Sequence, residues 1–278
     1  MSEAVPPPDP LIGKTVRAYR IQEVIGTGRW GTVYRAFQSS INRTAALRVL
    51  RQELAGLPGN AEQFLEKSRS QARLIHPNLV IVYEAGRADN LHFCAMECLD
   101  GPPLREFLRK NNVVDEHHLL LAVSSLARVL DFLWQEQVQH QPPLEQNVLT
   151  TVDGTVKLTN IDAVGVPASQ SPHEDLLRLG LMIAGVANDI SPVSRPVGRL
   201  VERILGAAGH EAFASLSDAA EAAEALDRRM FGPTPKMQLV TSGTGPSGRK
   251  WLMIAAGLIV VCIGLAVLAW LSHHPFTR

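Results

Sequence analysis

The sequence predicts an α+β fold of two lobes, a small β-rich lobe followed by a helical one. Near-alternating polar and apolar residues mark the segments up to about residue 98, whereas apolar spacing typical of helices follows. Strands first and helices afterwards are typical of an α+β arrangement. An uncharged apolar run at 251–271 predicts one further helix, outside the two lobes.

Composition excludes several classes of function. The chain has 278 residues, with 27 Lys plus Arg and 27 Asp plus Glu, so its net charge gives no general argument for nucleic-acid binding. The three cysteines, Cys94, Cys98 and Cys262, have no His or Cys companions at the spacing of metal ligands. We therefore expect reduced thiols and no metal site built from cysteine.

The β-rich lobe is expected to contain five strands and one long helix. The helix covers 61–75 and ends at His76, because Pro77 disfavours the helical conformation in the residue before it. The strands are expected at 19–25, 32–37, 45–50, 79–83 and 91–96.

The helical lobe begins after Asp100-Gly101. Helices are expected at 104–110 and 117–137, and the chain from 173 to 229 is helical with short breaks. Between them a hairpin is expected, with strands at 147–150 and 155–158 that turn at Asp153-Gly154.

Glycines at Gly26, Gly28 and Gly31 form a GxGxxG pattern between the first two strands. In a dinucleotide-binding fold the third glycine opens a helix, but here Val33 and Tyr34 continue a strand. The glycines are therefore expected to bend a hairpin over a phosphate group. The alternative is an ordinary hairpin that uses glycine only for its backbone freedom.

The order of the later segments resembles the bacterial, Hanks-type serine/threonine protein kinases from residue 19 to residue 229. Besides the glycine loop, five segments carry the resemblance. They are 45–50 (AALRVL), 76–83 (HPNLVIVY), 95–101 (AMECLDG), 153–159 (DGTVKLT) and 174–180 (EDLLRLG). The resemblance implies a two-lobed protein-kinase-like fold.

The positions that perform phosphoryl transfer in that family are substituted here. The strand lysine corresponds to Arg48, and the helix glutamate that pairs with it corresponds to Lys67, which would repel it. The catalytic aspartate corresponds to Pro142, which has no acid–base group, and the loop lysine to Leu144. The metal-binding aspartate corresponds to Asn160, whose amide carries no charge for Mg²⁺. We expect no catalytic residue and no metal ligand set.

The resemblance also implies a nucleotide-binding frame. ATP or another purine nucleotide, without Mg²⁺, is the expected ligand, and no cofactor is required. The alternative is that these are plain core positions with no ligand. The implied contact residues are Gly26, Gly28, Gly31, Val33, Ala46, Arg48, Met96 (the gatekeeper), Glu97, Cys98, Leu99, Asn147 and Leu149.

The activation segment is expected to be truncated. Only fifteen positions separate Asn160 from Asp175, and 163–172 contains no APE-like anchor, so the platform for a peptide substrate is missing. His140 and Asp175, which brace the catalytic loop in the family, are retained.

The expected domain division follows from these patterns and from the termini. A disordered leader (1–10) precedes the kinase-like domain (11–231), which comprises an N-lobe (about 11–98) and a C-lobe (about 99–231). After the domain we expect a flexible juxtamembrane linker at 232–250, a transmembrane helix at 251–271 and a short tail at 272–278.

The expected span is a helix of roughly 31 Å, which matches the hydrocarbon core of a bilayer. Trp251 and Trp270 lie at its edges. Arg249 and Lys250 precede it and Arg278 follows it, so the N-terminal domain is expected on the cytoplasmic side and the C-terminus outside.

The predicted function is that of a membrane-anchored pseudokinase, an interaction or regulatory module for a cytosolic signalling protein or an active kinase. One alternative is an active, atypical kinase that uses Arg48, Asn147 and Asp162; another is a relic that binds nothing. Gly257 and Gly264 offer a weak surface for homodimer packing in the span. The Ser and Thr residues of the linker are either phosphorylation sites or a plain spacer.

Overall fold

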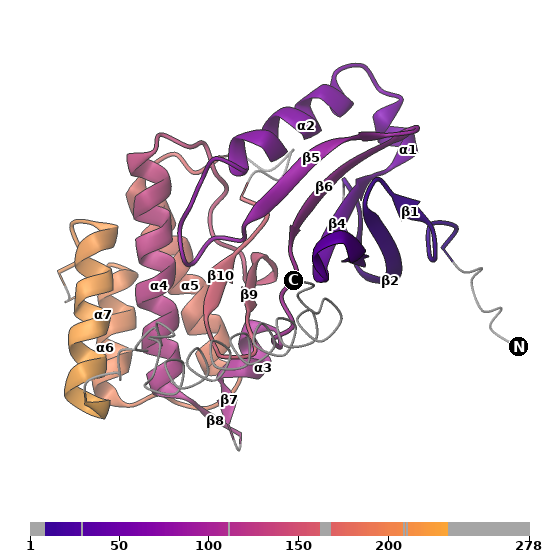
Figure 1. Cartoon of the computed structure of the whole chain (residues 1–278). Helices are drawn as coiled ribbons and strands as arrows, with labels where there is room; N and C mark the ends of the chain where they lie inside the picture. Colours follow the sequence, from indigo (N-terminus) through magenta and orange to yellow (C-terminus); the bar gives the residue numbers. More distant parts are fainter. Residues whose placement is uncertain are drawn as a thin grey trace, which may run out of the picture. The chain divides into compact units, whose positions relative to one another are not determined.

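A six-stranded antiparallel sheet forms the first lobe of the computed structural model, which describes residues 9–28, 30–110, 112–161, 168–207, 209 and 211–232. The strands are β1 (Thr15–Val16), β2 (Tyr19–Thr27), β3 (Gly31–Gln38), β4 (Arg43–Leu50), β5 (Val82–Ala88) and β6 (Leu91–Glu97). Their order in the sheet is β1-β2-β3-β4-β6-β5 (Figure 1).

Alternation along β4 gives the sheet two different faces. Leu47 and Val49 pack in the core of one face, whereas Ala46 and Leu50 pack on the other face. Helix α2 (Asn60–Gln71) covers this second face through Phe64, next to β5 and β6 (Figure 1). Because side chains alternate along a strand, Ala46 and Arg48 share the face that meets the second lobe.

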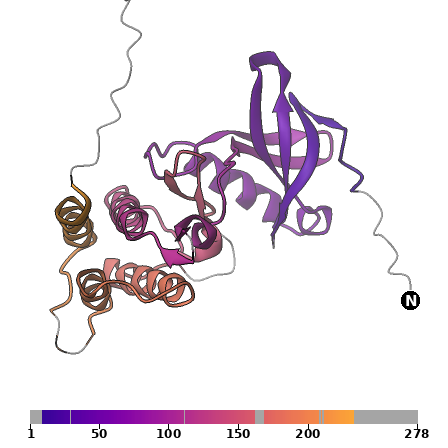
Figure 2. The same cartoon turned by 90° about the horizontal axis from the view of Figure 1, so that it is seen from below.

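Helices dominate the second lobe. Its elements are α3 (Leu104–Leu108), β7 (Arg109–Lys110), β8 (Val113–Val114), α4 (Glu116–Gln135), η2 (Glu145–Asn147), β9 (Val148–Thr150), β10 (Val156–Leu158), α5 (Pro172–Asn188), α6 (Arg195–Ile204) and α7 (Leu216–Phe231). Two short elements of the first lobe, η1 (Ser39–Ile41) and α1 (Gln52–Ala55), complete the set. Helix α4 is central, with α5 and α7 packed against it (Figures 1 and 2).

Side-chain caps fix where three of these helices begin. The hydroxyl of Ser171 accepts a hydrogen bond from the backbone N–H of Glu174, and Pro172 occupies the first turn of α5. Asp115 and Ser215 cap α4 and α7 in the same way. Each cap satisfies an N–H that has no partner inside the helix.

Most of the predicted elements are confirmed, with three local corrections. The strand expected at 79–83 is wrong in its first half, because Val80 N–H donates to the Leu158 carbonyl and pairs with β10 instead. The helix expected at 61–75 ends at Gln71. The helix expected at 104–110 ends at Leu108, since the next two residues pair with β8.

The described part of the chain includes residues 9 and 10 of the leader expected at 1–10. Asp9 accepts hydrogen bonds from the Tyr34 hydroxyl and from Leu11 N–H, both at 2.9 Å. The first of these bonds attaches Asp9 to β3. Residues 1–8 lie outside the described part of the chain.

The chain divides into two units, 1–233 and 234–278, and the second unit lies outside the described residues. The predicted span at 251–271, its tail and all but the first residue of the predicted linker are therefore not described. Among the residues that are described, no helix has both the length and the apolar character to cross a membrane.

Candidate functional site: a cavity between the lobes

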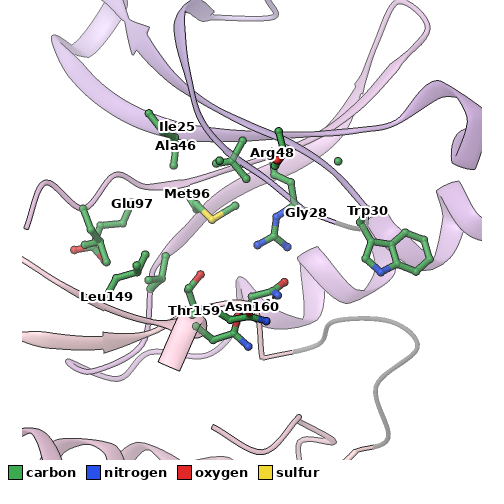
Figure 3. A pocket seen from close by; sticks show the side chains of 18 of the residues that line it. Ile25, Gly28, Trp30, Ala46, Arg48, Met96, Glu97, Leu149, Thr159 and Asn160 are labelled. Atoms are coloured by element: carbon green, nitrogen blue, oxygen red, sulfur yellow. Dashed lines mark hydrogen bonds between the residues drawn. The ribbon is translucent and has the colours of Figure 1, made fainter. Parts of the chain in front are cut away.

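A cavity of about 560 Å³ lies where the glycine loop, the end of β6 and the residues around η2 meet. Ala46 lies on one side of it and Leu149 on the other, with the Met96 side chain between them (Figure 3). A volume of this size is typical of small-molecule sites. Eleven of the twelve predicted contact residues line it: Gly26, Gly28, Gly31, Val33, Ala46, Arg48, Met96, Glu97, Leu99, Asn147 and Leu149.

Cys98 is the exception among those predictions. Its side chain is half-buried and does not line the cavity; its sulfur lies 4.0 Å from the Asp100 carboxylate instead. Burial raises the pKa of the Cys98 thiol, and the nearby Asp100 charge adds to this effect against the opposing influence of Arg35. The thiol is therefore not an activated nucleophile.

The three loop glycines have different roles. A Cβ on Gly31 would lie 2.0 Å from the Val49 carbonyl oxygen, so the fold itself requires glycine there. A Cβ on Gly26 would meet nothing within 4 Å, and one on Gly28 only the Gly31 carbonyl at 3.8 Å. Glycine at these two positions leaves open space beside the cavity, which is what a bound ligand requires.

The tip of the loop is held by the residue that follows β4. Gly28 N–H donates to the Gly31 carbonyl at 2.9 Å, and the guanidinium of Arg51 donates to the Gly28 carbonyl at 2.8 Å. Arg51 N–H also donates to the Trp30 carbonyl. The hairpin is thus closed over one end of the cavity.

Arg48 supplies the positive charge of the cavity. Its guanidinium extends from β4 toward Thr159 and Asn160 (Figure 3). Within the described part of the chain it makes no ion pair with a carboxylate. Lys67, at the position of the family's pairing glutamate, lies in a different cavity on α2. The structure thus keeps the two cations in separate cavities.

Glu97 is the single carboxylate among the described residues that line the cavity, and it is already engaged. Its Oε2 accepts from Lys157 Nζ at 2.8 Å and from Ile81 N–H at 3.2 Å. Lys157 is buried on β10, opposite Leu149. Its charge offsets that of Glu97, so Arg48 leaves the cavity with a net positive lining.

Amides occupy the end of the cavity where the family binds metal. Asn160 Nδ2 donates weakly to the Oδ1 of buried Asn147 at 3.5 Å. Asn160 has a φ of 54°, a left-handed conformation that asparagine tolerates better than most residues. The described residues contain no cluster of three His, Cys, Asp or Glu suited to a metal ion.

Two further predicted positions are placed by the structure. Leu144 lines the cavity, whereas Pro142 is buried and does not. Asp162, the carboxylate of the alternative catalytic hypothesis, lies outside the described residues. The one carboxylate of the described lining is thus Glu97, which is bonded to Lys157.

A buried polar frame supports the loop beneath. His140 Nε2 lies 2.9 Å from Asp175 Oδ2, the Trp134 indole donates to the same oxygen at 2.7 Å, and His140 Nδ1 lies 2.9 Å from the Val138 carbonyl. Burial alone lowers the pKa of His140, but its hydrogen bonds to Asp175 and Val138 and the Asp175 charge together raise the pKa. The frame expected for His140 and Asp175 is present.

Some lining residues have no counterpart in the sequence-based prediction. Thr27 and Trp30 line the cavity. Both lie within the glycine-rich loop, but the sequence pattern did not predict a ligand contact for either. Val80 and Thr159 also line the cavity. They lie next to the backbone hydrogen bonds that join residues 78–80 to Leu158 of β10. Nothing in the local sequence indicates this pairing.

The site and fold together define a two-lobed protein with a nucleotide-sized cavity beneath a glycine-rich hairpin. The protein kinase domain family matches residues 19–175, more than half of the chain. The chain belongs to this family, and the predicted resemblance is confirmed.

Bacterial kinases are among its curated relatives. It is 28% identical over 189 residues to the serine/threonine-protein kinase PknA of Mycobacterium tuberculosis, covering 66% of this chain and 43% of PknA. It is 28% identical over 151 residues to PrkC of Bacillus subtilis, covering 54% and 23%. A probable serine/threonine-protein kinase of Clostridium acetobutylicum is 25% identical over 174 residues, covering 63% and 26%. The chain thus spans less than half the length of these relatives.

Solved structures agree on the fold. The kinase domain of Mycobacterium tuberculosis PknI superposes with a TM-score of 0.60 at 23% identity, covering 76% of this chain and 97% of that chain.

Proposed function

We propose that this chain is a pseudokinase, a membrane-anchored regulatory module that binds a purine nucleotide without a divalent metal and does not transfer phosphate. The observation that carries the proposal is the charge of the inter-lobe cavity. Arg48 is its unneutralised cation, and the carboxylate of Glu97 is held by Lys157. A phosphate group meets a cation and amide donors there, with no described carboxylate free to hold Mg²⁺.

The lining also supports the absence of phosphoryl transfer. That reaction needs a carboxylate to hold Mg²⁺ and a group that accepts the substrate's proton. The corresponding positions are Asn160, which lines the cavity as a neutral amide, and Pro142, which is buried away from it. The family frame remains around a site that lacks these groups.

Nucleotide binding is tested by thermal denaturation of the full chain with AMP, ADP and ATP, each with EDTA or with Mg²⁺. We expect a rise in Tm that EDTA does not reduce. Arg48→Ala is expected to abolish it, whereas Arg20→Ala, an exposed arginine on β2 that does not line the cavity, is the matched control and is expected to leave it unchanged. A Tm rise that requires Mg²⁺ in the wild type contradicts metal-independent binding.

The alternative is an active, atypical serine/threonine protein kinase. Family membership and the retained Asn147 favour it. Incubation with γ-labelled ATP and Mg²⁺ or Mn²⁺ distinguishes the two functions. Label transfer that both Arg48→Ala and Asn147→Ala abolish would establish the kinase and exclude the pseudokinase.

The anchor and the partner rest on the sequence. An uncharged helix at 251–271 holds the domain at the membrane, with the domain on the cytoplasmic side. The proposed partner is a cytosolic signalling protein or an active kinase. Membrane fractionation of the full chain against a variant ending at Lys250 tests the anchor, and loss of the protein from the soluble fraction only when 251–278 is present is the expected result.

A further inference from the structure

The cavity between the lobes has an apolar end and a polar end. Met96 and Leu149 lie at the apolar end, whereas the guanidinium of Arg48 lies at the polar end and extends toward Thr159 and Asn160 (Figure 3). The two ends match the base and the phosphate of a nucleotide. The charge of the polar end then decides how many phosphate groups a bound nucleotide can carry.

The polar end has the charge of a single guanidinium. Arg48 is the one Lys or Arg side chain among the described residues that line the cavity. The buried Lys157 does not line it, and its ammonium is bonded to Glu97 Oε2 at 2.8 Å. Glu97 lies on the other side of Met96 from Arg48 (Figure 3). The charge of Lys157 is therefore spent on Glu97 and does not reach the polar end.

Neutral donors complete the polar end. Asn160 Nδ2 directs one N–H at Asn147 Oδ1, 3.5 Å away, and a primary amide has a second N–H to donate. Thr159 contributes a hydroxyl to the lining, and Gln146 contributes an exposed side-chain amide. A planar guanidinium can donate two parallel N–H bonds to one phosphate group. Arg48 and these neutral donors thus suit a single phosphate group without a metal ion.

A longer phosphate chain meets less favourable surroundings. Leu144 is half-buried and lines the cavity close to Asn147, whose N–H donates to the Leu144 carbonyl at 2.8 Å. Its side chain offers no hydrogen-bond donor to a further phosphate. Protein kinases neutralise the β- and γ-phosphates with Mg²⁺, but the carboxylate of the described lining, Glu97, is bonded to Lys157. Each further phosphate therefore adds negative charge that no described lining residue compensates.

We propose that the cavity selects nucleoside monophosphates, so that AMP binds more tightly than ATP. This inference rests on the proposed nucleotide binding and names the class of ligand. A phosphate monoester carries about 1.5 to 2 negative charges at pH 7, most of which one guanidinium and its neighbouring donors can compensate. Metal-free ADP and ATP carry more. A module with this preference responds to the monophosphate and discriminates against the triphosphate.

The test compares adenosine, AMP, ADP and ATP by isothermal titration calorimetry on the full chain in lipid nanodiscs, with EDTA at pH 7. We expect AMP to bind about tenfold more tightly than adenosine, because of its charge-assisted hydrogen bonds to Arg48, and about tenfold more tightly than ATP. Arg48→Ala is expected to lower the affinity for AMP to that for adenosine. Arg20→Ala, outside the cavity, is the control that retains the wild-type order of affinities.

An added cation tests the charge argument directly. Leu144→Lys places an ammonium group in the lining and is expected to raise the affinity for ATP about tenfold relative to that for AMP, which removes the preference. Val152→Lys is the matched control. It makes the same change of net charge in the turn between β9 and β10, at a side chain that is 81% exposed and outside the cavity, and is expected to keep the preference for AMP.

The outcomes distinguish this inference from the proposed function. If none of the four compounds binds, the proposed nucleotide binding is wrong and this inference with it. If ATP binds in EDTA at least as tightly as AMP, nucleotide binding stands and the monophosphate preference is wrong. Equal affinity for AMP and adenosine, or equal effects of the two lysine variants, would also overturn the preference. If Leu144→Lys lowers the Tm of the ligand-free protein, the wild-type order of AMP and ATP decides the question alone.

Discussion

His140 and Asp175 form a buried pair, with Nε2 and Oδ2 2.9 Å apart and side chains 1% and 0% exposed. The pair joins the loop before η2 to the first turn of α5. Because the Trp134 indole donates to the same carboxylate oxygen, α4 is bound into the pair as well. One carboxylate therefore connects three segments beneath the cavity.

Removing that carboxylate is expected to be costly. Asp175→Ala leaves His140 and the Trp134 indole buried without their partner, and breaking a buried pair typically costs about 3–5 kcal/mol of unfolding free energy. Urea denaturation measures this cost. The control is Arg178→Ala on the exposed side of the same helix, which is expected to change stability by less than about 0.5 kcal/mol. Equal effects of the two variants would contradict the structural role.

The pair also predicts the sign of a pH effect. Burial lowers the pKa of His140, but the hydrogen bonds to Asp175 and Val138 outweigh it and raise the folded-state pKa above its ordinary value. The stability from this proton is therefore fully present below the ordinary pKa and is lost as the pH rises through the raised one. We expect the stability difference between wild type and His140→Asn to shrink as the pH rises through neutrality. A stability difference that grows as the pH rises would mean that folding lowers the pKa of His140 and does not raise it.

Gly31 and Gly26 predict opposite outcomes for the same substitution. Gly31→Ala places a Cβ 2.0 Å from the Val49 carbonyl oxygen and forces β3 and β4 apart, a clash of the kind that costs about 1–3 kcal/mol. Gly26→Ala meets open space and is expected to be neutral or slightly stabilising in a strand. Urea denaturation of both variants gives the comparison. If Gly31→Ala leaves the free energy of unfolding unchanged, Gly31 does not pack against the Val49 carbonyl as the structure places it.

Much of this site was predictable from local patterns. Strand alternation places Ala46 and Arg48 on one face, and the glycine spacing locates the hairpin, so eleven of the twelve expected contacts line the cavity. Cys98 fails because its position in a motif does not determine which way its side chain points from the irregular segment after β6.

The remaining features depend on contacts between distant segments. Lys157 and Glu97 form an ion pair although they are 60 positions apart. The sequence around neither residue indicates that the other is its partner. The first half of the strand expected at 79–83 is wrong for the same reason, because Val80 N–H donates to the Leu158 carbonyl of β10, whereas residues 82–83 lie in β5 as expected.

The Lys157–Glu97 pair is expected to stabilise the region where the lobes meet. Lys157→Met leaves the partly buried Glu97 carboxylate with the hydrogen bond from Ile81 N–H, and loss of a hydrogen bond to a charged group costs about 1.5–3 kcal/mol. The double variant Lys157→Met with Glu97→Gln is expected to be less destabilised than the sum of the two single variants, since it leaves no uncompensated charge. Urea denaturation of the wild type, the two single variants and the double variant gives the four unfolding free energies of this double-mutant cycle. Simple additivity would show that the two side chains do not interact in solution.

A single substitution at Asn160 is expected to add metal dependence to nucleotide binding. Asn160→Asp places a carboxylate beside Asn147 Oδ1, and Mg²⁺ is commonly held by one or two carboxylates together with substrate phosphates. Aspartate also tolerates the left-handed backbone at this position. We therefore expect Mg²⁺ to increase the ATP-induced rise in Tm of the variant and not that of the wild type.

The control for this change is Asn160→Gly, which accepts the same backbone conformation without adding an oxygen ligand and is expected to show no response to Mg²⁺. Label transfer from ATP is expected to remain absent in Asn160→Asp, because Pro142 still offers no group to accept the substrate's proton. A wild type that responds to Mg²⁺ as strongly as Asn160→Asp would show that another carboxylate already serves the metal. The proposal that the cavity binds nucleotide without metal, which depends on the free charge of Arg48 and the neutralised charge of Glu97, would then be wrong.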